Sequence, residues 1–268
     1  MSDAIFTRDG DRHLPSAHAR GPWDPRALHG GAPAALLAEE IARAGDDHGA
    51  AMAVARLTCE FLGPVPLAPL TVAAEVVRPG RRFQLVEGEV RDASGTPVLR
   101  ARAVRLRRGA VELPADRGRA DGPPGGSPAA AGPSPFAAAP GEDPHAFHLS
   151  GMELRVARGA GDLGPGRARV WFRLAMPLVA GREPSPLARV VAAADFGNGA
   201  SRVLDWNVHL FVNTDLTVSL HREPAGEWVL LDATTRVEPE GRGLAWSVLH
   251  DERGPLGVAT QTLFVAAR

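Results

Sequence analysis

One segment of the chain, residues 109–146, differs in composition from everything on either side of it. Its central run, DRGRADGPPGGSPAAAGPSPFAAAPGEDP, is rich in Pro, Gly and Ala and offers little to bury. Such composition predicts a linker. It separates two stretches of similar length, 1–108 and 147–268, and each of them is long enough to form a core of its own. The segment therefore predicts two domains in tandem.

The two stretches carry the same order of patterns. Near the start of the first, HGGAPAALLAEEIARA (29–44) has apolar residues at helical spacing. Its counterpart in the second stretch is SPLARVVAAADFGNG (185–199), which ends in a glycine-rich stop. Both runs therefore predict one long helix in each half, over about 30–43 and 185–196.

Each predicted helix is followed by four strand-like runs. In the first half they are MAVARLTCEFL, PLTVAAEVVRP, RRFQLVEGEVRD and PVLRARAVRLRR. In the second half they are WNVHLFVNTDLTVSLHR, EWVLLDATTRVE, GLAWSVLHDE and GVATQTLFVAAR. Short turns such as DASGTP and DERGPL join them, which favours antiparallel neighbours.

One helix followed by four antiparallel strands, occurring twice, predicts two copies of one α+β unit. A sheet that wraps a single central helix is a hotdog fold. We therefore predict an α+β double hotdog of two tandem repeats, each with a central helix wrapped by an antiparallel sheet. Its parts are an N-terminal hotdog (1–108), a Pro/Gly/Ala-rich linker (109–146) and a C-terminal hotdog (147–268).

Charge and composition exclude several classes of function. The net charge of −1 argues against nucleic acid as a partner. No apolar run approaches the roughly 20 residues that span a bilayer. The opening MSDAIFTRDGDRH does not read as a secretory signal, so a cytoplasmic location is expected. The single cysteine, Cys59, excludes an internal disulfide and a cysteine-cluster metal site, and its apolar surroundings predict a buried thiol rather than a nucleophile.

Five motifs resemble the TesB-like acyl-CoA thioesterases, and their order spans both halves. They are GPWDPRALHGGAPAALLAEEIA, FLGPVPLAPLTVAAEVVRPGRR, SPLARVVAAADFGNG, NTDLTVSLHREPAGEWVLLDATT and GVATQTLFV. The resemblance implies an enzyme of lipid metabolism that hydrolyses a fatty acyl-CoA to free acid and CoA. It implies no metal and no cofactor. Because hotdog sheets often pair further, a homodimer or higher homo-oligomer is an expectation.

In that family an aspartate, a hydroxyl residue and a glutamine hold and activate a water. Carried over by motif, they fall on Asp195, Asn213 and Gln261. Asn213 departs from the pattern because an amide holds a water by hydrogen bonds but is not a hydroxyl. Thr214 could replace it only if the strand bulges there. The plainer alternatives are a solvent-facing Asp195 near a helix end and a cross-strand hydrogen bond for Gln261.

A second group of residues, His29, Gly30 and Gly31, stands at the predicted start of the first helix. Glycines there let the backbone approach a ligand, and free N-terminal amides can polarise a carbonyl oxygen. These residues predict a substrate-binding place, with the Gly31 amide as the favoured donor to the thioester oxygen. The alternative is an ordinary turn and N-cap.

Two other functions stay open. In a hotdog dehydratase or hydratase, His29 and Asp195 would together move a proton and a hydroxyl on an acyl thioester. A noncatalytic acyl-CoA-binding protein is the other alternative, which the missing hydroxyl leaves open. No HxxEH or HExxH zinc motif and no Gly-x-Ser-x-Gly elbow occurs, so a metalloprotease or a serine hydrolase is not expected.

Overall fold

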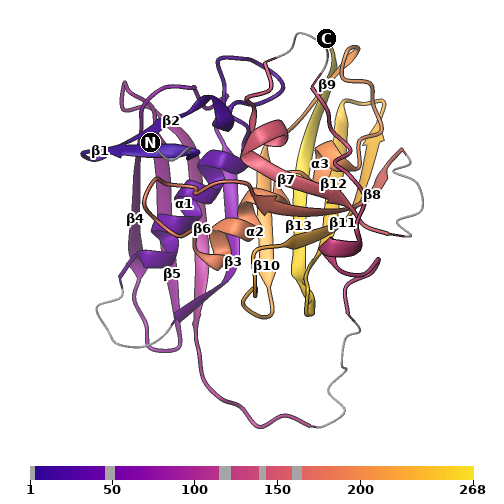
Figure 1. Ribbon diagram of the computed structural model, residues 1–268. Helices are drawn as coiled ribbons and strands as arrows, with labels where there is room; N and C mark the ends of the chain where they lie inside the picture. Colours follow the sequence, from indigo (N-terminus) through magenta and orange to yellow (C-terminus); the bar gives the residue numbers. More distant parts are fainter. Residues whose placement is uncertain (1–3, 46–51, 115–121, 139–142, 159–164) are drawn as a thin grey trace.

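A computed structural model describes residues 4–45, 52–114, 122–138, 143–158 and 165–268. It contains two central helices and a large sheet that wraps them (Figure 1). The helices are α1 (Gly31–Arg43), α2 (Pro186–Ala194) and the short α3 (Gly197–Ala200). The strands of the first half are β1 (Phe6–Asp9), β2 (Arg12–Pro15), β3 (Met52–Phe61), β4 (Leu70–Arg78), β5 (Phe83–Arg91) and β6 (Pro97–Arg107). Those of the second half are β7 (Met152–Val156), β8 (Arg167–Leu174), β9 (His209–Asn213), β10 (Asp215–Leu220), β11 (Val229–Glu238), β12 (Arg242–Asp251) and β13 (Gly254–Ala267).

The strand order repeats about the middle of the sheet. It runs β1-β2-β4-β5-β6-β3-β10-β13-β12-β11-β8-β7, with β9 paired to β13. β3 and β10 join the halves as antiparallel neighbours, with Thr58 opposite Thr217. Outward from this seam, β6, β5 and β4 on one side correspond to β13, β12 and β11 on the other. The predicted α+β double hotdog is confirmed.

Both central helices are buried because their sequences are apolar on nearly every face. In α1 every residue from Gly31 to Glu39 is buried, and Leu36, Leu37 and Ile41 have no exposed surface. Each such side chain contributes roughly 1.5–3 kcal/mol of hydrophobic stabilisation. α2 begins where the Ser185 hydroxyl accepts a hydrogen bond from the Ala188 N–H (3.2 Å), and it ends at Asp195.

The two helices pack against each other in opposite directions. A Cβ atom on Gly31, at the start of α1, would lie 2.9 Å from the carbonyl oxygen of Ala192 near the end of α2. At the other end, a Glu39 carboxylate oxygen accepts the Ser185 N–H (2.8 Å), and the second oxygen pairs with Arg43 (2.6 Å). The start of each helix therefore lies beside the end of the other.

The strands differ from the sequence prediction in three places. β1 and β2 precede α1 and extend the N-terminal sheet beyond its four predicted strands. β7 and β8 precede α2 and extend the C-terminal sheet in the same way. The run WNVHLFVNTDLTVSLHR forms two strands, because β9 ends at Asn213 and β10 begins at Asp215. The break lets the chain pair first with β13 and then with both β13 and β3.

The predicted linker contains little regular structure where it is described. Residues 115–121 and 139–142 lie outside the described residues. Between them, Pro128–Ala130 forms one 3-10 turn, and Gly132 exchanges backbone hydrogen bonds with Val156 of β7 (2.8 and 3.2 Å). The division of the chain at 109 and 146 stays a prediction. No helix in the described residues is both long and apolar enough to cross a membrane.

Candidate active site

Asp195 lies where the end of α2 meets the start of α1. Its side chain is only 3% exposed. A carboxylate at the end of its own helix is disfavoured by that helix's dipole, whereas the start of a neighbouring helix favours negative charge. The antiparallel packing of α1 and α2 supplies that neighbour, so the burial of Asp195 depends on both halves of the chain.

The structure brings Asp195, Asn213 and Gln261 together. The Asn213 side-chain amide donates to Asp195 Oδ1 (2.8 Å). The Gln261 side-chain amide donates to the Asp195 backbone carbonyl (3.1 Å) and lies 3.4 Å from Oδ1. One oxygen of the carboxylate therefore faces two amide donors, from the end of β9 and the middle of β13.

Asn213, and not Thr214, contacts the carboxylate. Thr214 falls in the break between β9 and β10, where its side chain is exposed and its N–H donates to the Thr262 carbonyl (2.9 Å). The Asn213 amide makes a second hydrogen bond, to the Asp215 carbonyl (3.2 Å), which fixes its orientation. The interruption of the strand thus leaves the amide, rather than a hydroxyl, at the site.

Gln261 also holds the turn that follows α2. Its side-chain oxygen accepts the Asn198 N–H (2.9 Å), and a Cβ atom on Gly197 would lie 2.9 Å from that oxygen. The Asn198 amide in turn donates to the Phe211 carbonyl (2.9 Å). Sequence reasoning missed Asn198, although an amide between two glycines shortly after Asp195, in the run DFGNGA, was a signal for it.

We expect Gln261→Ala to destabilise the protein, because it removes one side chain that positions Asp195 and also holds the turn after it. Leaving the buried Asn198 N–H without an acceptor costs about 1–3 kcal/mol. Chemical denaturation would measure the loss. The control is Gln84→Ala, which removes an equally buried amide from β5 in the other half. If both variants lose the same stability, the hydrogen bonds of Gln261 have no particular part in holding the turn.

His29 completes the surroundings of the carboxylate. Its Nδ1 lies 3.1 Å from Asp195 Oδ2 and 3.1 Å from the Gly31 nitrogen, so this atom either donates a proton to the carboxylate or accepts the Gly31 N–H. Its Nε2 has no hydrogen-bond partner among the described residues. The Gly31 amide, expected from the sequence to face a ligand oxygen, lies against the His29 ring instead.

Gly30 is needed for close packing at the same point. A Cβ atom there would lie 2.9 Å from Asp195 Oδ2 and 3.0 Å from the Phe61 ring. The pair of glycines therefore lets the start of α1 lie directly against the carboxylate and against α2. Any larger residue at either position forces Asp195 or the helix to move.

Aromatic rings enclose His29. Its ring stacks on Phe196 (4.4 Å between centroids) and lies 5.2 Å from Phe147, and Phe172 packs behind Phe196 (4.8 Å). Sequence reasoning did not find this cluster, because Phe147, Phe172 and Phe196 come from three separate segments of the chain. The rings make the side of the site away from Asn213 apolar.

The surroundings of two other residues, Cys59 and Arg222, are explained by contacts within the protein. Cys59 is fully buried, and burial together with the nearby charges of Asp195 and Asp215 raises the pKa of its thiol well above the usual range. It therefore stays a neutral thiol, as expected. Arg222 makes two hydrogen bonds of 2.6 Å to the buried carboxylate of Asp251.

Comparison with known proteins gives two matches to family models. The acyl-CoA thioesterase N-terminal domain matches residues 19–106, and the acyl-CoA thioesterase C-terminal domain matches residues 124–265. Among curated proteins no match was found.

Several solved structures are similar over nearly the whole chain. A protein assigned as a thioesterase II from Thermobifida fusca has a TM-score of 0.73 at 17% identity, covering 98% of this chain and 97% of its own. A protein of unknown function with a hot dog fold from Alicyclobacillus acidocaldarius has a TM-score of 0.69 at 20% identity, covering 98% and 95%. The TesB protein of Mycobacterium avium subs paratuberculosis has a TM-score of 0.64 at 17% identity, covering 97% and 96%. At these identities the likeness shows the fold alone.

Proposed function

Because this chain belongs to the acyl-CoA thioesterase family, we propose that it hydrolyses a fatty acyl-CoA to free acid and CoA through a water that Asp195 activates. The observation that carries the proposal is the asymmetry of the Asp195 carboxylate. Its Oδ1 faces the amides of Asn213 and Gln261, whereas among the described residues its Oδ2 has one polar side-chain neighbour, His29. Oδ2 is therefore the oxygen left to accept a proton from water.

The proposed reaction consumes only the acyl-CoA and one water. Asp195 Oδ2 takes a proton as the water oxygen bonds to the thioester carbon. His29, whose Nε2 has no partner among the described residues, would donate from that nitrogen to the carbonyl oxygen as negative charge develops there. The C–S bond then breaks, and the proton held by Asp195 goes to the departing CoA sulfur.

A screen of saturated acyl-CoA thioesters, from acetyl to long-chain, tests the proposal. Released CoA thiol is measured with a thiol reagent, beside the same screen on Asp195→Asn protein. We expect turnover of at least one chain length by the parent protein and its loss in the variant. Tight binding of acyl-CoA by the parent without turnover at any chain length would contradict hydrolysis and support a noncatalytic binding protein.

One contact favours a second candidate, an acyl thioester hydratase or dehydratase. The 3.1 Å separation of His29 Nδ1 and Asp195 Oδ2 places together the two groups that such a reaction would use. Incubation with an enoyl-CoA distinguishes the two functions, since hydration removes the enoyl absorbance without releasing thiol. Loss of that absorbance, with no hydrolysis of saturated substrates, would make this the better assignment.

We expect Asn213→Ala to lower turnover by about tenfold, because it removes a hydrogen bond to a charged group, worth roughly 1.5–3 kcal/mol. Hydrolysis kinetics with the preferred acyl-CoA would measure it. Asn213→Thr, which introduces the hydroxyl that this family carries there, is the matched control and should lose less. Equal rates for the parent and the alanine variant would show that Asn213 has no part in the reaction.

A further inference from the structure

The passage from β9 to β10 contains one residue more than the stretch of β13 that it faces. Asn213 stands opposite Leu263, and Thr217 stands opposite Thr260. Four steps along one chain therefore face three along the other, which is the arrangement of a β-bulge. A bulge re-aims the side chains next to it, and this one lies beside the residue whose amide contacts Asp195.

Asp215, the first residue of β10, completes the hydrogen-bond ladder at this bulge with its side chain. Its Oδ1 accepts the Thr262 N–H (2.8 Å), a contact that a backbone carbonyl makes in a regular ladder. The Thr262 carbonyl in turn accepts the Thr214 N–H (2.9 Å). Because Thr262 directly follows Gln261, the same carboxylate holds the strand that carries Gln261. Asp215 thus joins the two segments that bring amides to Asp195.

The backbone carbonyl of Asp215 sets the orientation of the Asn213 side chain. A primary amide has two N–H groups, and the Asn213 nitrogen donates to Asp195 Oδ1 (2.8 Å) and to the Asp215 carbonyl (3.2 Å). Both of these neighbours are acceptors, so the nitrogen of the amide, and not its oxygen, must lie on this side. The second contact therefore decides which end of the amide faces Asp195.

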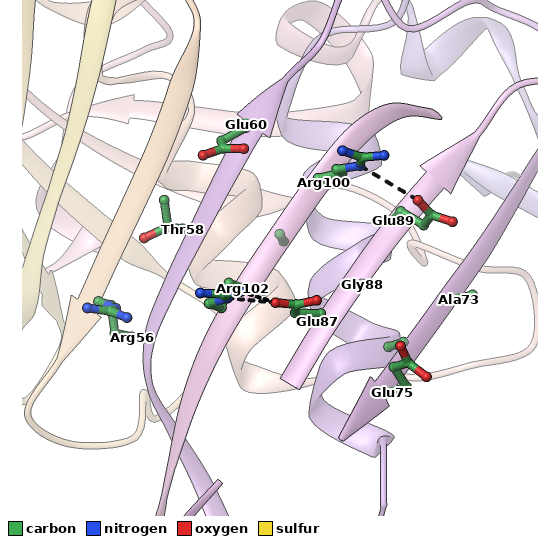
Figure 2. A pocket seen from close by; sticks show the side chains of 12 residues that line it. Arg56, Thr58, Glu60, Ala73, Glu75, Glu87, Gly88, Glu89, Arg100 and Arg102 are labelled. Carbon is green, nitrogen blue, oxygen red and sulfur yellow. Dashed lines mark hydrogen bonds and ion pairs between the residues drawn. The ribbon is translucent and has the colours of Figure 1, made fainter. Parts of the chain in front are cut away.

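Asp215 stands directly opposite another acid across the seam between the two halves. Its partner in the register is Glu60 of β3. Figure 2 shows Glu60 beside a hollow of about 990 Å³, in which Arg102 and Arg100 on β6 are joined to Glu87 and Glu89 on β5. In the part of the chain that the structure describes, neither Glu60 nor Asp215 has an ion-pair partner.

This pairing of two acids costs stability, because like charges directly opposite each other destabilise a sheet. The packing of the seam alone would therefore favour a neutral residue in place of Asp215. A local rule that is broken beside a candidate site points to a function for the residue that breaks it. A charged acceptor also makes a stronger hydrogen bond to an N–H than a neutral one does, which suits the contact with Thr262 at the bulge.

We propose that Asp215 is a positioning residue of the candidate site, whose carboxylate holds the bulge and whose carbonyl aims the Asn213 amide at Asp195. In this role it acts through Asn213 rather than on the substrate. The inference rests on the proposed function, since it adds a residue that prepares Asp195 for that reaction. A hydroxyl residue at position 213 would have one hydrogen to place, whereas an amide has two. The second acceptor therefore matches the asparagine that this chain carries.

Steady-state hydrolysis of the preferred acyl-CoA tests this role. Asp215→Ala removes the acceptor of the Thr262 N–H, which water can replace because Thr262 is exposed, so the fold should be kept. We expect kcat to fall by about three- to tenfold, up to the effect of losing the Asn213 contact itself, with KM unchanged. Asp215→Asn keeps an oxygen at the same place and should recover most of the loss. Circular dichroism checks the fold of each variant.

A double variant shows whether Asp215 acts through Asn213. If it does, Asp215→Ala combined with Asn213→Ala should have the kcat of Asn213→Ala alone, because the amide to be positioned is already missing. Losses that multiply in the double variant would overturn the proposal. The parent's kcat in Asp215→Ala, or no recovery in Asp215→Asn, would overturn it as well.

Glu60→Ala is the matched control, because it removes the acid opposite Asp215, and among the described residues the Glu60 side chain makes no hydrogen bond at the bulge. It should leave kcat unchanged. A second readout needs no turnover, namely the side-chain amide signals of Asn213 in NMR spectra of nitrogen-labelled protein. We expect Asp215→Ala to move them toward the values of a solvent-exposed asparagine, and Glu60→Ala to leave them in place.

The two readouts separate this inference from the proposed function. If the parent hydrolyses no acyl-CoA, the proposed function fails, and the amide signals of Asn213 decide the role of Asp215. Signals that do not move in Asp215→Ala would then overturn the positioning role, and signals that move there but not in Glu60→Ala would support it.

Discussion

Asp195→Asn is expected to reduce acyl-CoA turnover by about 10² or more, the usual size of a lost general base. The fold should survive, because the new amide has the shape of the carboxylate. Its oxygen can still accept the Asn213 amide, and its nitrogen can face His29 Nδ1 in place of Oδ2. Acyl-CoA binding should change little. Steady-state hydrolysis, with binding measured separately by calorimetry, would show the two effects apart.

The matched control is Asp92→Asn, the same chemical change in the turn between β5 and β6, where the carboxylate only caps the turn. It should leave turnover unchanged. If Asp195→Asn hydrolyses acyl-CoA at the parent rate, Asp195 is not the base and the proposed mechanism is wrong. If it fails to bind acyl-CoA as well, the residue shapes the site rather than activating water.

Asp251→Ala is expected to destabilise the protein by about 3 kcal/mol at neutral pH. The substitution leaves Arg222 without its partner, and breaking a buried ion pair costs roughly 3–5 kcal/mol. We expect a destabilisation at the lower end of this range because 29% of the Arg222 side chain is exposed to solvent. The N–H groups of Ala225 and Arg253 also lose their acceptor. Urea denaturation of both proteins at pH 7 would measure the difference.

The ion pair of Arg222 and Asp251 also predicts that the free energy of unfolding depends on pH. Burial alone would raise the pKa of Asp251, but the hydrogen bonds from Arg222 and from the two N–H groups outweigh it and hold the pKa below its usual range. In the unfolded chain this carboxyl has a pKa of about 3.9, and in the folded protein its pKa is lower. The ionised carboxylate therefore contributes its full stabilisation above about pH 3.9, and the contribution is lost as the pH falls through the pKa of the folded protein. The difference between parent and Asp251→Ala should therefore shrink at acid pH. A constant difference from pH 7 to pH 3 would contradict this assignment.

The main elements of the fold could be predicted because each has a strong local pattern. The helix over Gly31–Arg43 and the alternation that defines β12 are readable from neighbouring residues alone. β8 has the same alternation, with Ala168, Val170 and Phe172 inward, so this strand is also predictable from its own residues. β1, with four residues, has too few to show a period, and its pairing depends on β2 and on the chain near Leu178.

The site was predictable only in part. Asp195, Asn213 and Gln261 were named from the motifs that carry the resemblance, and their contacts follow from β9 and β13 flanking the end of α2. The contact of His29 with Asp195 was not derivable, because it depends on how α1 of one half lies against α2 of the other. The contact of the Gly31 amide with His29 is local, because the two residues are two positions apart in the chain.

The carboxylate of Glu39, which caps the start of α2, has a consequence for how such a chain can evolve. An assembly of two identical units repeats every position, so a side chain kept for chemistry must be kept twice. In a fused chain the two positions mutate independently. Beside the start of α1 this protein has Asp195, and beside the start of α2 it has Glu39, committed to Ser185 and Arg43. In the described residues, one junction between the helices therefore holds a carboxylate committed to capping, and the other holds the carboxylate of the candidate site.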